Sequence, residues 1–189
     1  FSLEHDIENG KYNSLVQVDS DTYALAYTST AKRGWISTFT ISDDGTSIVE
    51  VDTSNYSDTS LGRFNSLVHV IDDTYALAHA GTGGHGYIST FTISSDGATI
   101  DPIESLEHDD QRGQDNSLVQ VDSNTYALAY SGEDTKGYIS TFEIDSDGEI
   151  TPIRVQNHAE VGGTVNLEHD GSKGTYNSLV QVDSDTYAL

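Results

Sequence analysis

The chain has 189 residues, enough for one domain with a sizeable core, and 31 acidic against 8 basic residues give a net charge of −23. This charge argues against nucleic acid and anionic membrane surfaces as partners, because contact with phosphates requires Lys and Arg. The chain has no cysteine for a disulfide or thiolate site, and no apolar run approaches the roughly 18 residues that span a bilayer.

The first residues, FSLEHD at 1–6, recur in part as SLEHD at 105–109. This recurrence indicates that residues 1–6 are the end of a preceding repeat unit. Because the chain begins with Phe1 rather than Met, we expect a processed, trimmed or partial chain, in which a missing signal peptide is uninformative.

Each repeat unit opens with two strand-like blocks. The first reads NSLVQVD or NSLVHVI, at 13–19, 65–71, 116–122 and 177–183. The second reads TYALAY, TYALAH or TYAL, at 22–27, 74–79, 125–130 and 186–189. The Asn residues that open the first block are 52, 51 and 61 residues apart. A few polar residues separate the two blocks, which favours a hairpin.

A third block, such as GYISTFTIS, lies at 34–42, 86–94 and 137–145, and a weaker fourth block lies at 46–51, 98–108 and 149–155. The blocks are rich in Val, Ile, Thr, Tyr and Phe, as strands are, and none has the 3.6-residue apolar spacing of a helix. Asp-Gly between the third and fourth blocks supplies the positive φ of a short turn. Each unit is therefore predicted to be a four-stranded antiparallel meander.

We predict an all-β fold, a β-propeller or propeller segment with about 3.5 four-stranded blades per chain, because the unit length matches a blade. The alternation of large and small residues in Tyr-Ala-Leu-Ala-Tyr suits packing between neighbouring blades. The predicted units are the end of a preceding blade at 1–6, then 12–57, 64–109, 115–170 with an insertion at 155–165, and a half-blade at 176–189.

The final half-unit ends after its second block, so a third strand is missing from any blade built from both termini. Unpaired strand edges seek partners. We therefore expect self-association, either into a homodimeric ring of about seven blades or into a longer array.

The segment GYISTFEIDSDGEITPI at 137–153 resembles blades of lactonase-like and YVTN-type propellers, and the near-identical units are similar to environmental bacterial or archaeal repeat proteins. The resemblance covers about a third of each unit and implies fold more than activity. Lactonase-type enzymes carry one asymmetric set of acidic, His and Arg residues at the channel mouth. No such set matches here, so no catalytic residue is carried over.

LEHD occurs at 3–6, 106–109 and 167–170. A His beside carboxylates suggests a divalent metal site or a base, with His5, Asp6, His108, Asp109, His169 and Asp170 as candidate ligands. Because the motif recurs in several units, we favour a structural role, as for the Gly-His pair of WD-type propellers. Catalysis usually needs a single constellation.

The turns at 42–45, 94–97 and 145–148 (SDDG, SSDG and DSDG) invite a calcium interpretation, but they lack the Glu of an EF-hand loop. Plain β-turns are the favoured interpretation, and no cofactor is expected apart from this calcium alternative.

The loop between the second and third blocks, at 28–34, 80–86 and 131–137, keeps its length while its chemistry changes. Loops on a rigid scaffold often carry binding residues, whereas drift of a surface loop is the alternative. The candidate ligand-binding residues are Lys32, Arg33, Trp35, His85, Tyr87, Asp134, Lys136 and Tyr138. The insertion, with His158 and Glu160, is either a further binding loop or an extended hairpin.

The leading functional prediction is a non-enzymatic extracellular or cell-surface module that binds a carbohydrate or another surface ligand through several loops, or acts as a scaffold. The alternative is a lactonase-like or other hydrolytic propeller enzyme. Enzymatic activity stays open with a preference against it, because no phosphate-binding loop, nucleophile elbow or zinc motif is present in the sequence.

Overall fold

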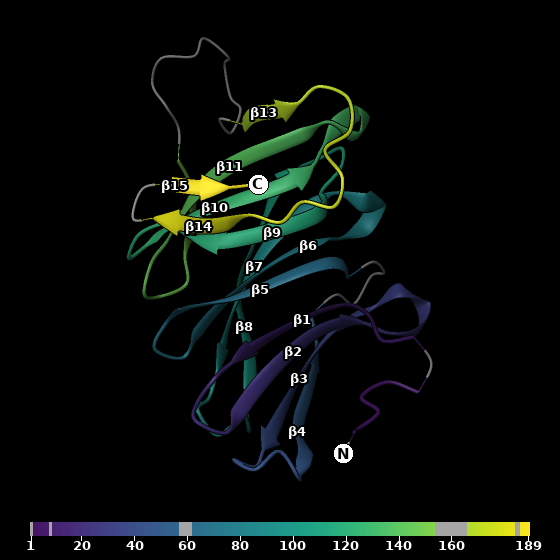
Figure 1. Cartoon of the computed structure of the whole chain (residues 1–189), viewed down its shortest axis with the longest axis vertical. Helices are drawn as coiled ribbons and strands as arrows, with labels where there is room; N and C mark the ends of the chain where they lie inside the picture. Colours follow the sequence, from purple (N-terminus) through teal and green to yellow (C-terminus); the bar gives the residue numbers. More distant parts are fainter. Residues whose placement is uncertain (1, 8, 57–61, 154–165, 184–185) are drawn as a thin grey trace.

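A computed structural model describes residues 2–7, 9–56, 62–153, 166–183 and 186–189. It confirms the predicted all-β fold of a propeller segment, with three antiparallel sheets and a two-stranded half-sheet (Figure 1). Blade 1 contains β1 (Lys11–Gln17), β2 (Thr22–Thr28), β3 (Gly34–Ile41) and β4 (Ile48–Asn55). Blade 2 contains β5 (Arg63–Ile71), β6 (Thr74–Ala80), β7 (Gly86–Ile93) and β8 (Ile100–Asp109).

Blade 3 contains β9 (Gln114–Gln120), β10 (Thr125–Ser131), β11 (Gly137–Ile144), β12 (Ile150–Pro152) and β13 (Asn166–Asp170). The half-blade contains β14 (Val180–Asp183) and β15 (Thr186–Ala188). Figure 1 shows blade 1 at the bottom, blade 2 in the middle, and blade 3 with the half-blade at the top. Consecutive strands pair within each sheet, as in the predicted meander.

The fourth strand of blade 3 is divided in two. β12 pairs with β11 at Phe142, Glu143 and Ile144, whereas β13 pairs with the other half of β11, from Gly137 to Ser140. The two short strands thus lie along the same edge of one sheet. The predicted insertion at 155–165 falls between them, outside the described residues.

The N-terminal segment was expected to end a preceding blade, and its described residues 2–7 form no strand. The His5 ring nevertheless packs edge-on against Tyr27 with ring centroids 5.0 Å apart. His108 at the end of β8 packs in the same way against Tyr130 of blade 3, at 4.7 Å. The segment therefore provides the aromatic contact of a fourth-strand end without strand pairing.

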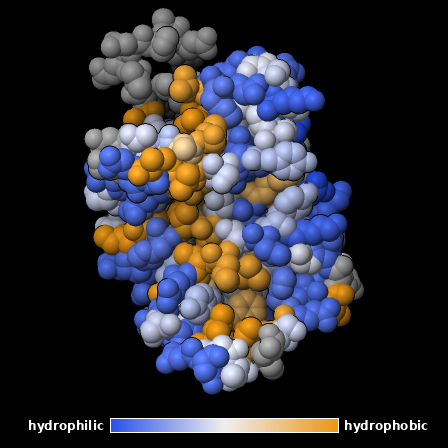
Figure 2. Space-filling view, viewed as in Figure 1, coloured by the Kyte–Doolittle hydropathy of each residue, from blue (hydrophilic) through white to orange (hydrophobic). Residues whose placement is uncertain are grey.

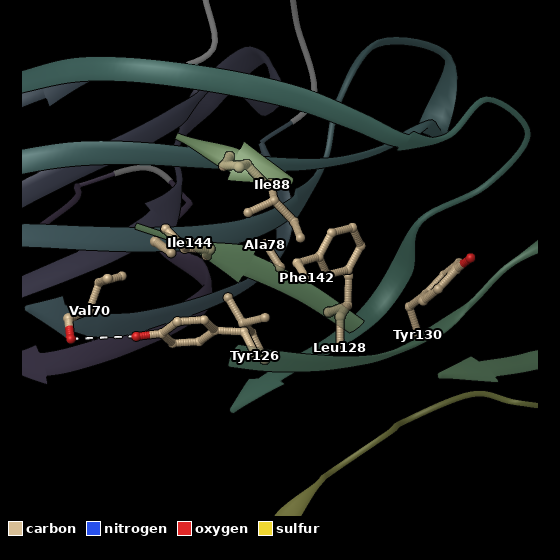
Figure 3. Packing of buried hydrophobic residues seen from close by; sticks show 11 residues of the cluster. Val70, Ala78, Ile88, Tyr126, Leu128, Tyr130, Phe142 and Ile144 are labelled. Atoms are coloured by element: carbon tan, nitrogen blue, oxygen red, sulfur yellow. Dashed lines mark hydrogen bonds between the residues drawn. The ribbon is translucent and has the colours of Figure 1, made fainter. Parts of the chain in front are cut away.

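Each complete blade has one face of large apolar residues and one face of smaller ones. In the second strands, Tyr and Leu point to the first face, and Ala points to the second. Blade 3 presents its large face to Ala76 and Ala78 of blade 2, and both alanines are fully buried (Figure 3). The large face of blade 3 contains Leu118, Tyr126, Leu128, Tyr130, Phe142, Ile144 and Ile150.

The same arrangement joins blade 1 to blade 2. Ala24, Ala26 and Ile36 of blade 1 pack against the large face of blade 2, and Val16 and Val18 adjoin them. The large face of blade 2 contains Leu67, Tyr75, Leu77, Phe91, Ile93 and Ile100. The core thus lies between the blades, which explains why Tyr-Ala-Leu-Ala recurs.

Hydrogen bonds from the NSL motif also link the first strands of neighbouring blades. The Oγ atom of Ser14 accepts a hydrogen bond from the backbone N–H of Leu67 at 2.9 Å. Ser117 Oγ does the same for Leu179 N–H at 2.8 Å. The serine of one motif therefore satisfies a backbone donor of the next motif along the chain.

The Asn of the motif reaches back to the preceding blade. Asn116 Nδ2 donates to the carbonyl oxygen of Phe64, and Asn177 Nδ2 donates to that of Asp115, both at 3.1 Å. Phe64 and Asp115 lie at positive φ, 56° and 51°, in bulges that interrupt the strand register. Such bulges redirect a backbone group out of the ladder.

The Asp-Gly turns dock on the preceding blade. Thr38 Oγ1 donates to the carbonyl oxygen of Gly97, and Thr90 Oγ1 donates to that of Gly148, both at 2.7 Å. Gly97 and Gly148 have φ values of 72° and 83°, which favour glycine. These turns therefore join the blades as well as reversing the chain.

Candidate functional site

The loops between the second and third strands have the same secondary structure in all three blades. Each contains a single 3₁₀ turn, at Thr30–Lys32, Thr82–Gly84 and Glu133–Thr135. The residue after each turn is basic or a histidine, and the second residue of the following strand is aromatic. Both lie at the end of the blade where the fourth strand also ends, because the strands are antiparallel.

In blade 2 this arrangement forms a three-residue group. His85 Nδ1 lies 2.5 Å from the Oε1 of Glu107, a residue of the second LEHD motif. The Tyr87 hydroxyl donates to the same oxygen at 3.4 Å. Burial, followed by the charge of Glu107, raises the pKa of Tyr87 above its ordinary value. The hydroxyl therefore stays protonated and able to donate at neutral pH.

Blade 3 repeats the group with a lysine. Lys136 Nζ lies 3.3 Å from Glu168 Oε2, and Tyr138 stands opposite Glu168 in the strand register. The hydrogen bond to Glu168 and its charge raise the pKa of Lys136. Exposed pairs of this kind contribute at most about 1 kcal/mol to folding, so stability does not explain why the group recurs.

Blade 1 has the same positions with different side chains. Arg33 precedes β3, and Trp35 stands opposite Asn55 of β4. Lys32 is exposed in the loop at a φ of 66°, and Asp134 of blade 3 is exposed at 54°. We call Arg33, Trp35, His85, Tyr87, Glu107, Lys136, Tyr138 and Glu168 the loop rim.

Each rim tyrosine stacks on a ring from the second strand of its own blade. The ring of Tyr87 stacks on His79 with centroids 5.7 Å apart and an interplanar angle of 19°. Tyr138 stacks on Tyr130 at the same centroid distance and 28°. A Cβ on Gly81 would lie 2.5 Å from the Tyr87 ring, so glycine makes room for the ring there. The tyrosines are thus fixed in place, with one ring side packed against the blade.

The structure groups four of the eight predicted loop residues, His85 with Tyr87 and Lys136 with Tyr138, and adds a glutamate to each pair. Glu107 and Glu168 belong to the LEHD motifs, which were considered separately from the loops. The sequence contained the information that connects the motifs with the loops. The second and third LEHD motifs lie at the ends of fourth strands, and each loop directly precedes a third strand. Antiparallel pairing of those strands places them side by side.

The histidines and aspartates of LEHD have separate environments. The His108 ring is buried against Gly86, Tyr130 and Phe142, and neither ring nitrogen has a protein hydrogen-bond partner. His169 and His5 likewise pack against Gly137 and Gly10. Burial, and then the charge of His79, lowers the pKa of His108 to about 3.

The aspartates that follow these histidines cap turns. Asp109 Oδ1 accepts from the backbone N–H of Gln111 and Arg112, both at 2.9 Å. Asp170 Oδ1 accepts from Ser172 and Lys173, and Asp6 Oδ1 accepts from Asn9. In the part of the chain that the structure describes, no three His, Asp or Glu side chains are grouped to hold a metal ion.

In the Asp-rich turns, Asp carboxylate oxygens accept hydrogen bonds from other groups of the same turn. Asp44 Oδ1 accepts hydrogen bonds from Ser42 Oγ, Thr46 N–H and Thr46 Oγ1, which lower the pKa of Asp44 to about 2. Asp96 Oδ1 accepts from Ser94 Oγ and from the backbone N–H of Ala98. These contacts are those of plain β-turns.

Comparison with known proteins shows the fold. No protein-family model and no curated protein sequence matches the chain. Among solved structures, it is similar to the Pseudomonas aeruginosa periplasmic gluconolactonase PpgL, with 11% identity and a TM-score of 0.57, over 84% of this chain and 40% of that protein. The chain thus resembles a lactonase-like propeller in fold, as predicted.

Two further structures give the same result. A Lactobacillus plantarum protein has a TM-score of 0.58 and 14% identity, over 80% of this chain and 45% of its own. A hypothetical selenium-binding protein from Sulfolobus tokodaii has a TM-score of 0.61 and 12% identity, over 94% of this chain and 48% of its own. The chain therefore spans less than half the length of each of these structures.

Among the described residues, no helix has the length and apolar character needed to cross a bilayer. The segment with His158 and Glu160 lies outside the residues that the structure describes.

Proposed function

We propose that the chain is an extracellular or cell-surface repeat module that binds carbohydrate through its loop rim, without catalysis. The observation that carries the proposal is the recurrence of one group, a basic side chain, a fixed aromatic ring and a carboxylate, in blades 2 and 3. Hydroxyl-rich ligands suit such a group because carboxylates accept, amines and imidazoles donate, and aromatic rings pack on the apolar side of a sugar.

Repetition fits weak binding at each blade. When several sites engage one surface at once, the second binding event becomes intramolecular, and avidity exceeds the affinity of either site. Differences between the groups, with Trp35 and Arg33 in blade 1, would broaden the range of ligands. A location outside the cytoplasm is supported by the fold similarity to a protein described as periplasmic.

Glycan-array binding, with and without a chelator, tests the proposal. The Tyr87→Ala, Tyr138→Ala double variant should lose binding, whereas Tyr87→Phe with Tyr138→Phe should retain part of it because the rings remain. Circular dichroism verifies that each variant is folded. Binding that survives the double alanine variant would refute the rim as the site. Failure of the folded wild-type chain to bind any glycan would favour a scaffold role.

A hydrolytic enzyme is the second candidate, and one observation favours it: the fold similarity to a protein described as a gluconolactonase. Turnover of a lactone panel tests this candidate directly. Hydrolysis above the uncatalysed rate would replace the binding proposal, and the catalytic residues would then be sought by substitution along the rim.

A further inference from the structure

The loop rim of blade 1 differs in charge from the rims of blades 2 and 3. In blades 2 and 3, the residue opposite the rim tyrosine is a glutamate that pairs with the basic residue of the loop. In blade 1, the residue opposite Trp35 is Asn55, an uncharged amide. The ion pairs among the described residues are those of blades 2 and 3, so Lys32 and Arg33 have no carboxylate partner there. Each group forms within its own blade, and the contrast therefore comes from the sequence of β4.

Arg33 starts from the same backbone conformation as the basic residues of the other two loops. Its φ and ψ are −72° and 145°, compared with −60° and 153° for His85 and −69° and 152° for Lys136. Trp35 follows two residues later in β3, and alternate residues of an extended chain point to the same face. The Arg33 side chain therefore shares a face with the Trp35 ring.

Lys32 adds a second cation to this group. Its carbonyl oxygen accepts a hydrogen bond from the N–H of Gly62 at 2.9 Å, which attaches the loop to the start of the next unit. Its φ of 66° is a left-handed conformation, which the equivalent Gly84 of blade 2 adopts without strain. Lys32 and Arg33 are also the only adjacent basic residues in a chain that has 8 basic and 31 acidic residues. The loop thus holds two cations in a fixed place.

The group is open to a ligand in solution. The side chains of Lys32 and Arg33 are exposed, and that of Trp35 is half-buried. Figure 2 shows hydrophilic side chains along both margins of the molecule, with a hydrophobic band between them. The loops between the second and third strands lie on the right in Figure 1, at one of these hydrophilic margins.

The remaining charges restrict an anion to direct contact with this group. The net charge of −23 repels anions at long range, and a nearby hollow, to which Arg33 and Trp35 do not contribute, is lined by three carboxylates. These carboxylates belong to Glu4, Asp6 and Glu50. At physiological ionic strength, repulsion between exposed charges is screened beyond about 8 Å, whereas a contact between a cation and a carboxylate persists.

We propose that the blade 1 part of the loop rim binds a sugar residue that carries a carboxylate, such as a hexuronate. Arg33 and Lys32 contact the carboxylate, and Trp35 packs on the sugar ring. The inference rests on the proposed carbohydrate binding and names the ligand class of one of its sites. A guanidinium donates two parallel hydrogen bonds to a carboxylate, so Arg33 favours an acidic sugar over a neutral one.

The rims of blades 2 and 3 suit neutral sugars. Their glutamates, Glu107 and Glu168, already contact the basic residues and would repel a second carboxylate. The chain therefore carries one site for an acidic sugar beside two for neutral sugars.

Isothermal titration calorimetry of the full chain tests this proposal with a galacturonic acid oligosaccharide and its carboxyl-reduced counterpart, at about 0.15 M salt. The counterpart has the same length and linkages, but hydroxymethyl groups replace its carboxylates. We expect the acidic oligosaccharide to bind more tightly by a factor of about ten or more. Arg33→Gln should reduce this preference to less than about threefold. Lys173→Gln, which removes the same charge from an exposed turn of blade 3, should leave it unchanged.

A second variant tests the role of the glutamate that blade 1 lacks. Asn55→Glu gives blade 1 the residue that blades 2 and 3 have opposite the aromatic ring, where its carboxylate would pair with Arg33. This variant should lose the preference for the acidic oligosaccharide, while the neutral counterpart still binds at the rims of blades 2 and 3. Circular dichroism verifies that each variant is folded.

The outcomes separate this inference from the proposed function. Equal affinity for the two oligosaccharides would overturn the inference and leave carbohydrate binding in place. A preference for the acidic oligosaccharide that persists in both Arg33→Gln and Asn55→Glu would locate the acidic site elsewhere and would also overturn it. Binding of neither oligosaccharide by the folded chain would overturn it as well, and the glycan array then decides whether any other carbohydrate is bound.

Discussion

Ser66 accepts a hydrogen bond from the backbone N–H of Leu118 in the next blade, with 2.9 Å between Oγ and nitrogen. The bond crosses from β5 to β9, and the same bond links Ser14 to Leu67 and Ser117 to Leu179. It gives the serine of the repeated NSL motif a physical role, because the serine accepts a hydrogen bond from a backbone N–H of the next blade.

Ser66→Ala should lower the free energy of unfolding by about 1–3 kcal/mol, because it leaves the Leu118 N–H without its acceptor in a half-buried position. Ser123→Ala, on the exposed turn after β9, is the matched control and should change stability by less than about 0.5 kcal/mol. Urea unfolding followed by circular dichroism measures both. Equal stability of the two variants would count against the role assigned to the motif.

Leu118→Ala should lower the free energy of unfolding by about 2–5 kcal/mol, because it opens a cavity in the contact between blades 2 and 3. Leu15→Ala makes the same chemical change in the same motif at a site that is 59% exposed, so its cost should be several-fold smaller. Both are measured at low protein concentration, where association contributes least. Similar costs would mean that the large face of blade 1 is covered in solution.

Acid should destabilise the fold between pH 6.5 and about pH 4. Burial lowers the pKa of His79 to about 4, and that of His108 to about 3, so both are neutral in the folded protein. The unfolded chain binds protons at these residues below about pH 6.5, and stability is therefore present above that pH and lost as the pH falls.

For His79 alone, this loss is on the order of 2–3 kcal/mol at pH 4. His108→Phe, which keeps a planar ring against Gly86, should weaken the pH dependence. The measurement is the urea midpoint as a function of pH. A pH dependence unaltered by His108→Phe would exclude this histidine as a cause.

Gly86→Ala should destabilise the protein by about 1–3 kcal/mol, since the new Cβ would overlap the His108 ring and force it out of its place. Gly171→Ala is the comparison, because its Cβ would meet only the Glu168 carboxylate, at 3.0 Å. Thermal unfolding of both variants tests this. A harmless Gly86→Ala would show that the histidine ring does not lie over this glycine.

The sequence predicted the meander and the propeller-like fold because Tyr-Ala-Leu-Ala and the Asp-Gly turns report local structure directly. It also suggested the alternation of large and small residues, which the contacts of Ala78 and Leu128 bear out. It did not predict the contacts between Ser66 and Leu118 or between Thr38 and Gly97, because those depend on how one blade is placed against the next.

The sequence predicted some residues of the candidate site but did not connect them with the glutamates. His85 and Tyr87 were chosen for their place in a variable loop, whereas Glu107 was passed over as part of a motif dominated by His108. Only the register of β7 with β8, which sets Tyr87 opposite Glu107, joins the two. For His108, the sequence analysis favoured a structural role over a metal site, and the structure places the ring against Gly86, Tyr130 and Phe142.

The split outer strand of blade 3 has a practical consequence. β12 and β13 both pair with β11, on the edge away from β10, so each half of the divided strand keeps its place in the sheet. A peptide tag or a small guest domain fused between Pro152 and Asn166 would leave the contacts between blades unchanged. Blade 3 thus offers an attachment point for display, and the corresponding positions in blades 1 and 2 could be lengthened in the same way.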